Sequence, residues 1–465
     1  MQSRSRRFTA TICSVAALSL AASACTNASS SKGAAPSETG SATATTYQGT
    51  DFTTNQPVNA PGVTSTEIHV ATITSKTNPI GGDNVLLNDG IQGYFDLVNS
   101  KGGIWGRQLK ITNKHDDQTV ANLNETQAML AQDNVYAVFE AVELFTGAKL
   151  LAKKGIPTFG WNINAEWAGP TNFFPNIAPI CFGKTCSAIG KAMPWIVQQE
   201  GKHKVAVIGY DVPQSSDAMT SSAREIEKFS KDVDAQVVYQ DVSLQFGQTD
   251  YSAQVAQMKQ KHVDFLATAL DFNGDYAIAK EMQRQGILDK VTFFHPNLYN
   301  PDFLAKNAAL LEGGIALIPV LAIEHKPVPP ALQEYLDYAQ SHDIKVTEMT
   351  EEGWIAARQF VDALKAAGPD FTWAHLIGAW NQQTAYTNGG IVPPIDWTRQ
   401  HNDPTKSVAN RSKLQCVNFA RMHDGKFVGI YDDGGAKPWV CFHGQQPDTW
   451  EKPENLSFAP ATSGG

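Results

Sequence analysis

The stretch VYAVFEAVELFTGAKLLAKKGIPTFGWNIN, residues 135–164, decides the fold expected for this chain. Residues 135–139 form a short apolar run rich in β-branched and aromatic side chains, which is typical of a buried strand. A short helical pattern begins near Thr146 and ends at Gly155, and residues 156–160 form a second apolar run. The pattern therefore predicts one βαβ unit, whose strands lie parallel because a right-handed crossover joins them.

The loops that follow these two strands carry polar and aromatic side chains that are unusual for plain connectors. Both loops open on the same edge of the sheet, and ligands of such sheets bind outside that edge. We therefore expect the two loops to form half of a ligand cleft. Solvated loop carboxylates and an aromatic ring packed between lobes are the alternative roles for these side chains. The candidates are Glu140, Glu143, Trp161, Asn162 and Asn164.

The length and composition indicate a globular protein with more than one core. A chain of 465 residues predicts two or three domains, and 42% hydrophobic and 18% charged residues are ordinary for a soluble protein. The formal net charge is −9, and no basic tract follows the N-terminal segment. Because phosphate binding needs concentrated Lys and Arg, we expect no nucleic acid among the partners.

The first 24 residues have the pattern of a signal peptide. Basic residues precede the apolar run at 12–22, which is too short to span a bilayer comfortably. The run ends in the sequence Ala-Ser-Ala-Cys, which resembles a bacterial lipobox and predicts lipidation of Cys25. An ordinary cleavable signal with an incidental cysteine is the alternative. Residues 25–65 are mostly Ser, Thr, Ala, Gly and Pro, so we expect a flexible tether on the outer face of the cell membrane.

The four cysteines after the N-terminal segment predict two disulfides. An even number in an exported chain favours pairing, and proximity in sequence suggests the pairs Cys181–Cys186 and Cys416–Cys441. A zinc site is the rival interpretation, but the spacing lacks the CxxC pattern that such sites prefer.

Strand and helix patterns alternate from residue 67 to residue 320, which predicts parallel sheets covered by helices on both sides. The strands are too many for one core, so two sheets are expected. After the prolines at 327–330 the pattern becomes helical over 331–342 and 351–368. Two alternating runs joined by Asp424-Gly425 then predict a β-hairpin.

No motif of a catalytic centre or cofactor site occurs in the sequence. A GxSxG elbow, an HExxH pair, a P-loop and a dinucleotide fingerprint are all missing. The run His115-Asp116-Asp117 is compatible with metal binding, but Asp117 is also a preferred helix cap. We therefore expect no enzymatic activity, no cofactor and no metal.

The run IQGYFDLVNSKGGIWGRQLKI at 91–111, followed by Asp116-Asp117, resembles the start of type I periplasmic solute-binding proteins. The resemblance is to the branched-chain amino acid (Leu/Ile/Val)-binding family of ABC transporters, and GIPTFG at 155–160 and CVNFARMHDGKF at 416–427 also fit. It implies an α/β fold of two doubly wound parallel-sheet lobes, joined by a three-crossing hinge, that close on a small ligand. The implied parts are lobe 1 at 66–180 and 325–390, lobe 2 at 181–324 and 391–450, and a tail at 451–465.

The resemblance also implies where a ligand binds. In amino-acid-binding members, lobe 1 holds the ligand carboxylate and a carboxylate of lobe 2 pairs with the ammonium group. Here the position of that carboxylate falls near the uncharged Asn297, so an α-amino acid is not favoured, although Asp271 is a substitute. Glu140 and Glu143 favour a cationic or polyhydroxylated ligand instead. The expected ligand residues of lobe 2 are Tyr210, Gln214, Asp271, Phe272, Asn297 and Tyr299.

The function implied by the resemblance is capture of a small polar solute for uptake. We expect a monomeric, lipid-anchored, extracytoplasmic solute-binding protein that closes on an amino acid, an amide or a related compound and delivers it to the permease of an ABC transporter. A ligand-sensing subunit of a membrane receptor or kinase is the alternative. A secreted hydrolase on a similar scaffold is a third hypothesis, and it would need a catalytic carboxylate such as Asp271.

Overall fold

The computed structural model describes residues 51–78, 82–178, 190–295, 299–402 and 412–459. The chain divides into a unit of residues 1–40 and a unit of residues 41–465, and all described residues belong to the second. The predicted signal peptide, Cys25, Cys181, Cys186 and Asn297 lie outside the described residues. Within the described ranges, no helix combines the length and the hydropathy that a membrane crossing requires.

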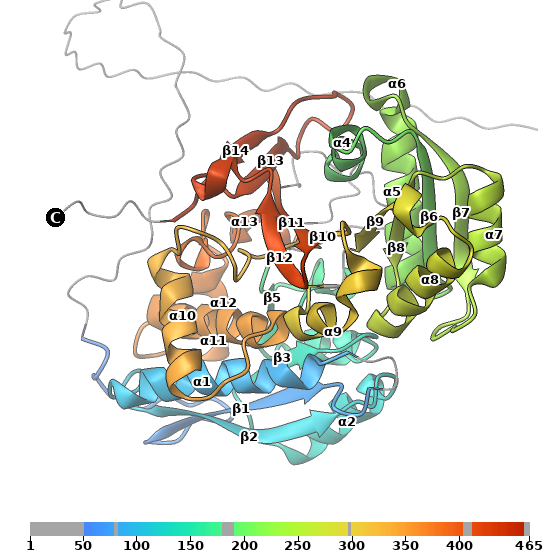
Figure 1. The fold of residues 1–465 in the computed structure, drawn as a ribbon. Helices are drawn as coiled ribbons and strands as arrows, with labels where there is room; N and C mark the ends of the chain where they lie inside the picture. The colour runs from blue at the N-terminus through green and yellow to red at the C-terminus, as the bar shows by residue number, and fades with distance from the viewer. Residues whose placement is uncertain (1–50, 79–81, 179–189, 296–298, 403–411, 460–465) are drawn as a thin grey trace, which may run out of the picture. The chain divides into compact units, whose positions relative to one another are not determined.

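The first sheet is fully parallel and forms the centre of lobe 1 (Figure 1). It contains the βαβ unit predicted from residues 135–164, with the connecting helix ended by Gly155 at a positive φ of 73°. Its strands, in the order β2-β1-β3-β4-β5, are β1 (Glu67–Thr74), β2 (Gln108–Asp116), β3 (Ala137–Ala141), β4 (Thr158–Gly160) and β5 (Phe173–Pro175).

Alternate side chains of these strands are buried under helices on opposite faces. Phe139 packs against Phe95 and Phe360, with ring centroids 6.0 and 5.7 Å away, whereas Val138 packs in a separate cluster with Met129 and Leu151. The two residues pack on opposite faces because successive side chains of a strand point to opposite sides of the sheet. The helices of lobe 1 are α1 (Leu87–Ser100), α2 (Asn122–Gln132), α3 (Ala148–Lys154), α10 (Pro330–Ser341), α11 (Glu348–Ala367) and α12 (Trp373–Trp380).

A distant part of the chain therefore completes lobe 1. Helix α11 lies alongside α1 over the sheet, although about 250 residues separate them in sequence (Figure 1). Trp105 donates its indole N–H to the carbonyl of Leu364 at 2.8 Å, and Tyr136 donates its hydroxyl to the carbonyl of Phe371 at 2.5 Å. These bonds and the shared apolar core hold α11 and the segment after it in place.

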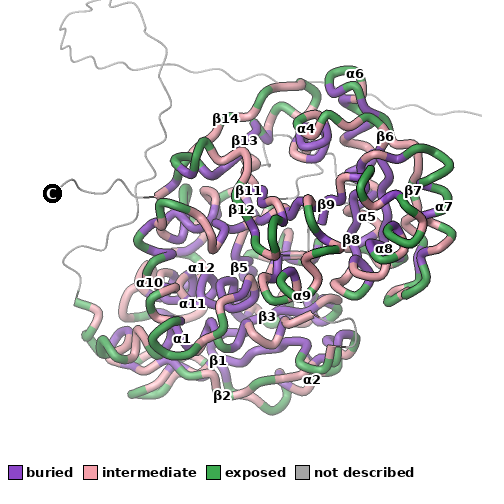
Figure 2. Tube along the Cα trace, in the orientation of Figure 1, coloured by how far each residue is buried: buried purple, intermediate pink, exposed green. Residues whose placement is uncertain are grey.

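The second sheet forms the centre of lobe 2 and is of mixed direction. The strands from β6 to β10 pair in parallel, and β11 is added antiparallel to β10. Its strands are β6 (Lys204–Tyr210), β7 (Gln236–Leu244), β8 (Phe265–Ala269), β9 (Thr292–His295), β10 (Ile315–Ile318), β11 (Leu414–His423), β12 (Lys426–Ile430), β13 (Trp439–His443) and β14 (Glu454–Leu456). Figure 2 shows buried residues in its central strands, and all residues of β8 are buried.

Helices cover both faces of this sheet as the alternating pattern predicts. Met219 of α5 packs with Val207 on one face, and Ile278 of α8 packs with the other apolar cluster, which contains Ile208. The helices of lobe 2 are α4 (Ala192–Gln199), α5 (Pro213–Lys228), α6 (Ser230–Val233), α7 (Ser252–Gln260), α8 (Phe272–Arg284) and α9 (Pro301–Leu311), and the short α13 (Trp397–Gln400) precedes β11.

The end of the chain forms the predicted hairpin and one predicted disulfide. Strands β11 and β12 are joined by Asp424 and Gly425, both at positive φ, which suits a two-residue turn. Cys416 and Cys441 are direct register partners on β11 and β13 and form a disulfide. Both predictions are confirmed.

The order of the elements along the chain produces a fold of two α/β lobes. Strands β1–β5 belong to lobe 1, β6–β10 to lobe 2, α10–α12 to lobe 1 again, and β11–β14 to lobe 2. The chain therefore passes between the lobes more than once, and residues remote in sequence meet where the lobes face each other. The two-lobe α/β fold expected from the sequence is confirmed.

Candidate functional site

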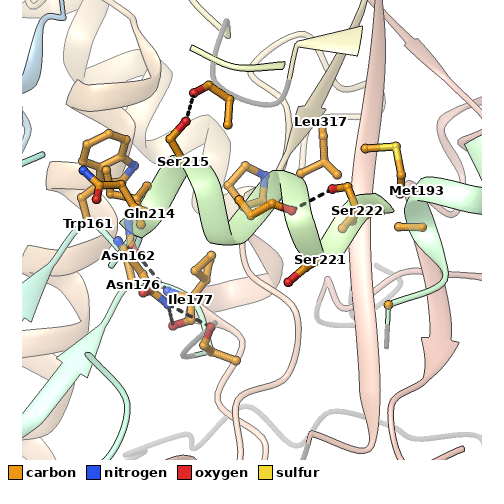
Figure 3. Close-up of a pocket in the computed structure, with 18 of the residues that line it drawn as sticks. Trp161, Asn162, Asn176, Ile177, Met193, Gln214, Ser215, Ser221, Ser222 and Leu317 are labelled. Atoms are coloured by element: carbon orange, nitrogen blue, oxygen red, sulfur yellow. Dashed lines mark hydrogen bonds between the residues drawn. The ribbon is translucent and has the colours of Figure 1, made fainter. Parts of the chain in front are cut away.

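A cavity of about 510 Å3 is lined by residues of both lobes, and its volume is ordinary for a small-molecule site. Lobe 1 contributes the loops that follow β1, β3, β4 and β5 and the first turn of α11. Lobe 2 contributes the end of β6, helix α5 and the residues between β8 and α8. Figure 3 shows the cavity residues along α5, with Trp161, Asn162 and Asn176 near one end of the helix and Met193 and Leu317 near the other.

Asparagines on the lobe 1 wall have their amide N–H groups directed at protein acceptors. Asn162 donates to the carbonyl of Ala178 at 3.0 Å, and its own backbone N–H donates to Asn176 Oδ1 at 3.2 Å. Asn176 donates its side-chain N–H to Glu352 Oε2, and Asn84 donates to Glu143 Oε1 at 3.2 Å. The Oδ1 of Asn162 is buried and has no hydrogen-bond partner among the described residues.

Carboxylates of α11 complete this wall. The capping box of Thr347 and Thr350 starts the helix, which puts Glu348 and Glu352 one turn apart at its N-terminus. Both line the cavity, and Glu352 is only 1% exposed, with its Oε1 unpartnered among the described residues. Burial, reinforced by Asp83, raises the pKa of Glu348 to about 8. Burial, together with the charge of Glu348, also raises the pKa of Glu352 well above its usual range.

Glu143 lies between these groups and lobe 2. It follows β3, is half-buried, and lines the cavity. Burial raises the pKa of its carboxyl to about 7, with smaller contributions from the charges of Asp271 and Asp117 and an opposing one from the bond to Asn84. At neutral pH this group is therefore divided between its protonated and ionised forms.

Asp271 on the lobe 2 wall is held in a different way. It is the N-cap of α8, and its Oδ1 accepts from the backbone N–H groups of Asn273 and Gly274 at 2.9 and 3.0 Å. Its Oδ2 accepts from the hydroxyl of Tyr210 at 2.5 Å, and that hydroxyl lies 3.2 Å from the hydroxyl of Tyr251. Asp271 thus fastens the end of β6 to the start of α8.

Two hydrogen bonds cross between the lobes beside the cavity, and near them Lys345 of lobe 1 forms an ion pair with Asp302 of α9 at 2.8 Å. Gln214 of α5 donates to the backbone carbonyl of Glu143 at 2.8 Å, and Asn300 donates to Asp83 Oδ2 at 2.9 Å. Asp83, Glu143 and Gln214 all line the cavity. The lobes are therefore in direct contact at the edge of the site.

The structure brings most of the candidate residues together around this cavity. The lining includes Glu143, Trp161, Asn162, Tyr210, Gln214, Asp271 and Phe272.

Glu140, Asn164 and Tyr299 lie outside the cavity lining. Strand β3 continues to Ala141, so Glu140 belongs to the strand rather than the loop; it is 1% exposed and accepts from Asn122 at 3.1 Å. Asn164 donates to the carbonyl of Val142 at 3.1 Å, which ties two loops together, and Tyr299 bonds to Glu324. These side chains support the wall from behind.

Several polar residues of the lobe 1 wall were not among the candidates; they include Asp83, Asn84, Asn176, Glu348 and Glu352. The first two follow the first strand in a glycine-rich loop, which was a usable signal because β1 ends at the same sheet edge as β3 and β4. The two glutamates gave no such signal, because acidic residues in the first turn of a helix are common.

The side chains of His115 and Asp117, which the sequence made compatible with metal binding, have protein partners in the structure. The ring of His115 instead pairs with Glu125 at 3.1 Å and with Asp133 at 2.7 Å. Asp117 accepts from the hydroxyl of Ser75 and the N–H of Thr119. Within the described part of the chain, the group with suitable ligand spacing is the exposed set of Glu312, His423 and Asp424 on lobe 2, none of which lines the cavity.

The chain is similar in fold to several solved structures. These include a branched chain amino acid ABC transporter from Thermus thermophilus with bound valine (17% identity, 78% of this chain and 95% of that one, TM-score 0.62). A fatty acid ABC transporter substrate-binding protein from Thermomonospora curvata has 17% identity, covers 85% and 97% of the two chains, and gives a TM-score of 0.63. A solute binding protein of an ABC transporter from R. palustris, in complex with benzoate, has 17% identity. The match covers 78% of this chain and 95% of that one, with a TM-score of 0.59.

These identities are low, so the structures establish the fold, and no curated protein gives a significant match. The sequence itself matches the model of one family, described as periplasmic binding protein, over residues 67–426. That match spans more than half of the 465 residues and includes the strands and loops that form both walls of the cavity. The chain therefore belongs to the periplasmic binding protein family.

Proposed function

We propose that this protein captures a small polar solute outside the cytoplasm by closure of its two lobes and delivers it to the permease of an ABC transporter. The observation that carries the proposal is the cavity of about 510 Å3 with walls from both lobes. A solute that touches both walls stabilises the closed arrangement by its differential affinity for it, which gives a permease a loaded state to recognise. The family and the named structural relatives support this role.

The contacts between the lobes fit such a mechanism. The bonds Gln214 to Glu143 and Asn300 to Asp83 form only when the lobes meet, and each is a single hydrogen bond beside the cavity. Contacts of this kind contribute about 1 kcal/mol each, so they leave the balance between open and closed states to the solute. The role is to bind and release the solute without chemical change.

The site of action in this proposal is the outer face of the cell membrane. The signal-like segment at 1–24, lipidation of Cys25 and the tether after it hold the protein there as a lipid-anchored monomer. The tether is shorter than the expected 25–65, because Phe52 packs on Trp105 and Arg107 donates to the carbonyls of Gln56 and Thr64, which fixes the end of that stretch on lobe 1. We assign lobe 1 to residues 66–180 and 325–390 and lobe 2 to 181–324 and 391–456. The start of the expected tail at 451–465 belongs to lobe 2, because β14 pairs with β13. The membership of β1–β5 and α10–α12 in one lobe and of β6–β11 in the other supports this division.

Calorimetry and thermal unfolding of the mature chain, with Cys25 replaced by Ser, test the proposal. The panel contains amino acids, amides, amines and aromatic acids. A solute present at 100 times its Kd should stabilise the folded chain by about 2.7 kcal/mol, and small-angle scattering should show compaction. If no solute shifts unfolding while a membrane receptor binds the chain directly, uptake is the wrong role and sensing takes its place.

A further inference from the structure

We propose that the solute is an amine with an apolar body, whose cationic group binds the lobe 1 wall at Glu352, Glu348, Glu143 and Asn162. The inference rests on the proposed function and names the chemical class of the ligand. Four observations support it. They are the acidic lining, the wall amide N–H groups that already donate to protein acceptors, the buried acceptors without a partner, and the apolar stretch that continues from the wall.

The described lining of the cavity is strongly acidic. Its carboxylates are Asp83, Glu143, Glu225, Asp271, Glu348 and Glu352. Its one cation within the described residues is Lys191, which is 1% exposed and pairs with Glu451 Oε1 at 2.7 Å. A carboxylate solute would therefore meet no available counter-charge in the described lining, whereas an ammonium group would meet several carboxyl partners.

The side-chain amide donors of the lobe 1 wall are directed at protein acceptors. The side-chain amides of Asn84, Asn162 and Asn176 donate to Glu143, Ala178 and Glu352, respectively. Gln214 reaches across from lobe 2 and donates to the carbonyl of Glu143. With these N–H groups engaged, the wall has mainly acceptors left, so a solute must supply the donors.

Two of these acceptors are buried and unpartnered within the described residues. They are Asn162 Oδ1, on a residue 2% exposed, and Glu352 Oε1, on a residue 1% exposed. Asn176 lies between them, because it accepts from the backbone of Asn162 and donates to the other oxygen of Glu352. Buried acceptors in folded proteins normally have a donor, and the three N–H groups of an ammonium ion can reach several at once.

The rest of the cavity is suited to an uncharged body. It runs along α5 past Met193 and Leu317 (Figure 3), and Phe442 also belongs to its lining. At the wall itself, Trp161 and Phe272 are half-buried aromatic side chains in the lining, and their faces attract cations. The solute class is therefore an aliphatic or aromatic amine rather than a fully hydrated polyvalent cation.

Binding of a cation here should release protons. Burial raises the pKa values of Glu143, Glu348 and Glu352, and the other ionisable groups whose charges act among them are Glu351 on α11, Asp83 after β1, Asp117 after β2 and Asp271 of lobe 2. An ammonium group replaces the bound protons, so its affinity increases as pH rises from 6 to 8. An anionic solute would bind protonated carboxyls better and would show the opposite trend.

Calorimetry on the mature chain with matched probes tests the inference. The probes are hexylamine and phenylethylamine, with hexanoate and phenylpropionate as carboxylates of similar size. We expect the amines to bind at least tenfold more tightly than the carboxylates, with proton release measured in buffers of different ionisation enthalpy. Tighter binding of the carboxylates, or of a neutral compound, overturns the inference but leaves solute capture intact.

Variants of two wall carboxylates test where the cationic group of the solute binds. Glu352→Gln and Glu143→Gln should each weaken amine binding at least tenfold and reduce proton release. Glu166→Gln, which changes an exposed carboxylate of lobe 1 outside the lining, should change neither. Equal affinity in all three variants overturns the inference, and unchanged unfolding temperatures identify the variants as folded. If no probe binds but a solute of the wider panel that is not an amine does, the inference also fails while the proposed function stands.

Discussion

The two walls of the cavity contain the same kind of side chain in opposite states. On lobe 2, Asp271 accepts two backbone N–H groups and the hydroxyl of Tyr210. On lobe 1, Glu352 has one oxygen bonded to Asn176 and one without a partner among the described residues. The difference shows that a carboxylate at a cavity is not automatically a ligand group. Its role depends on how many donors the protein already supplies.

The pH dependence of stability should give the largest effect. Burial raises the pKa of Glu143 to about 7 and that of Glu348 to about 8, from an ordinary value of 4.5. Between pH 5 and these values the folded chain holds protons that the unfolded chain releases. Stability is therefore highest at low pH within this range and is lost as pH rises through 7 and 8, by up to about 1.4 kcal/mol per pH unit for each group.

Chemical denaturation of the ligand-free chain from pH 5 to pH 9 measures this slope. Glu348→Gln should flatten it, because glutamine has no proton to lose. An unchanged slope in that variant would mean that the lobe 1 wall is better solvated than its burial indicates.

Removal of the Asp271 carboxylate on lobe 2 should have the second largest effect on stability. Asp271→Ala deletes the cap of α8 and the acceptor of the Tyr210 hydroxyl, and we expect a loss of roughly 2 kcal/mol in the free energy of unfolding. The control is Asp211→Ala, an exposed carboxylate beside Tyr210, which should change stability by less than about 0.5 kcal/mol. Equal losses in the two variants would contradict the structural role assigned to Asp271.

Loosening the contact between the walls should have the smallest effect. Gln214→Ala removes the bond to the carbonyl of Glu143 and should shift the open–closed balance by about 1 kcal/mol, seen as a larger radius of gyration in scattering without ligand. Gln198→Ala removes a bond of the same type within lobe 2, to the carbonyl of Asp232, and should leave the radius unchanged. A larger radius in both variants would point to general loosening rather than lobe opening.

Local patterns explain how much of the site was predictable. The βαβ unit and the polar loops after β3 and β4 follow from periods and turn residues that a short window contains. Glu140 shows the limit of such reasoning. Strand β3 runs two residues further than the apolar pattern indicates, so this side chain is buried behind the wall rather than in the loop.

The sequence by itself determined the alternation of strands and helices, the hairpin at Asp424-Gly425 and the disulfide partners Cys416 and Cys441, because each depends on neighbours along the chain. Only the tertiary structure decided that Glu348 and Glu352 complete the wall begun by Asn162. About 190 residues separate them, and α11 reaches the wall because it packs on α1 in the core of lobe 1. Which acceptors are left unpartnered depends on that packing, which no stretch of sequence contains.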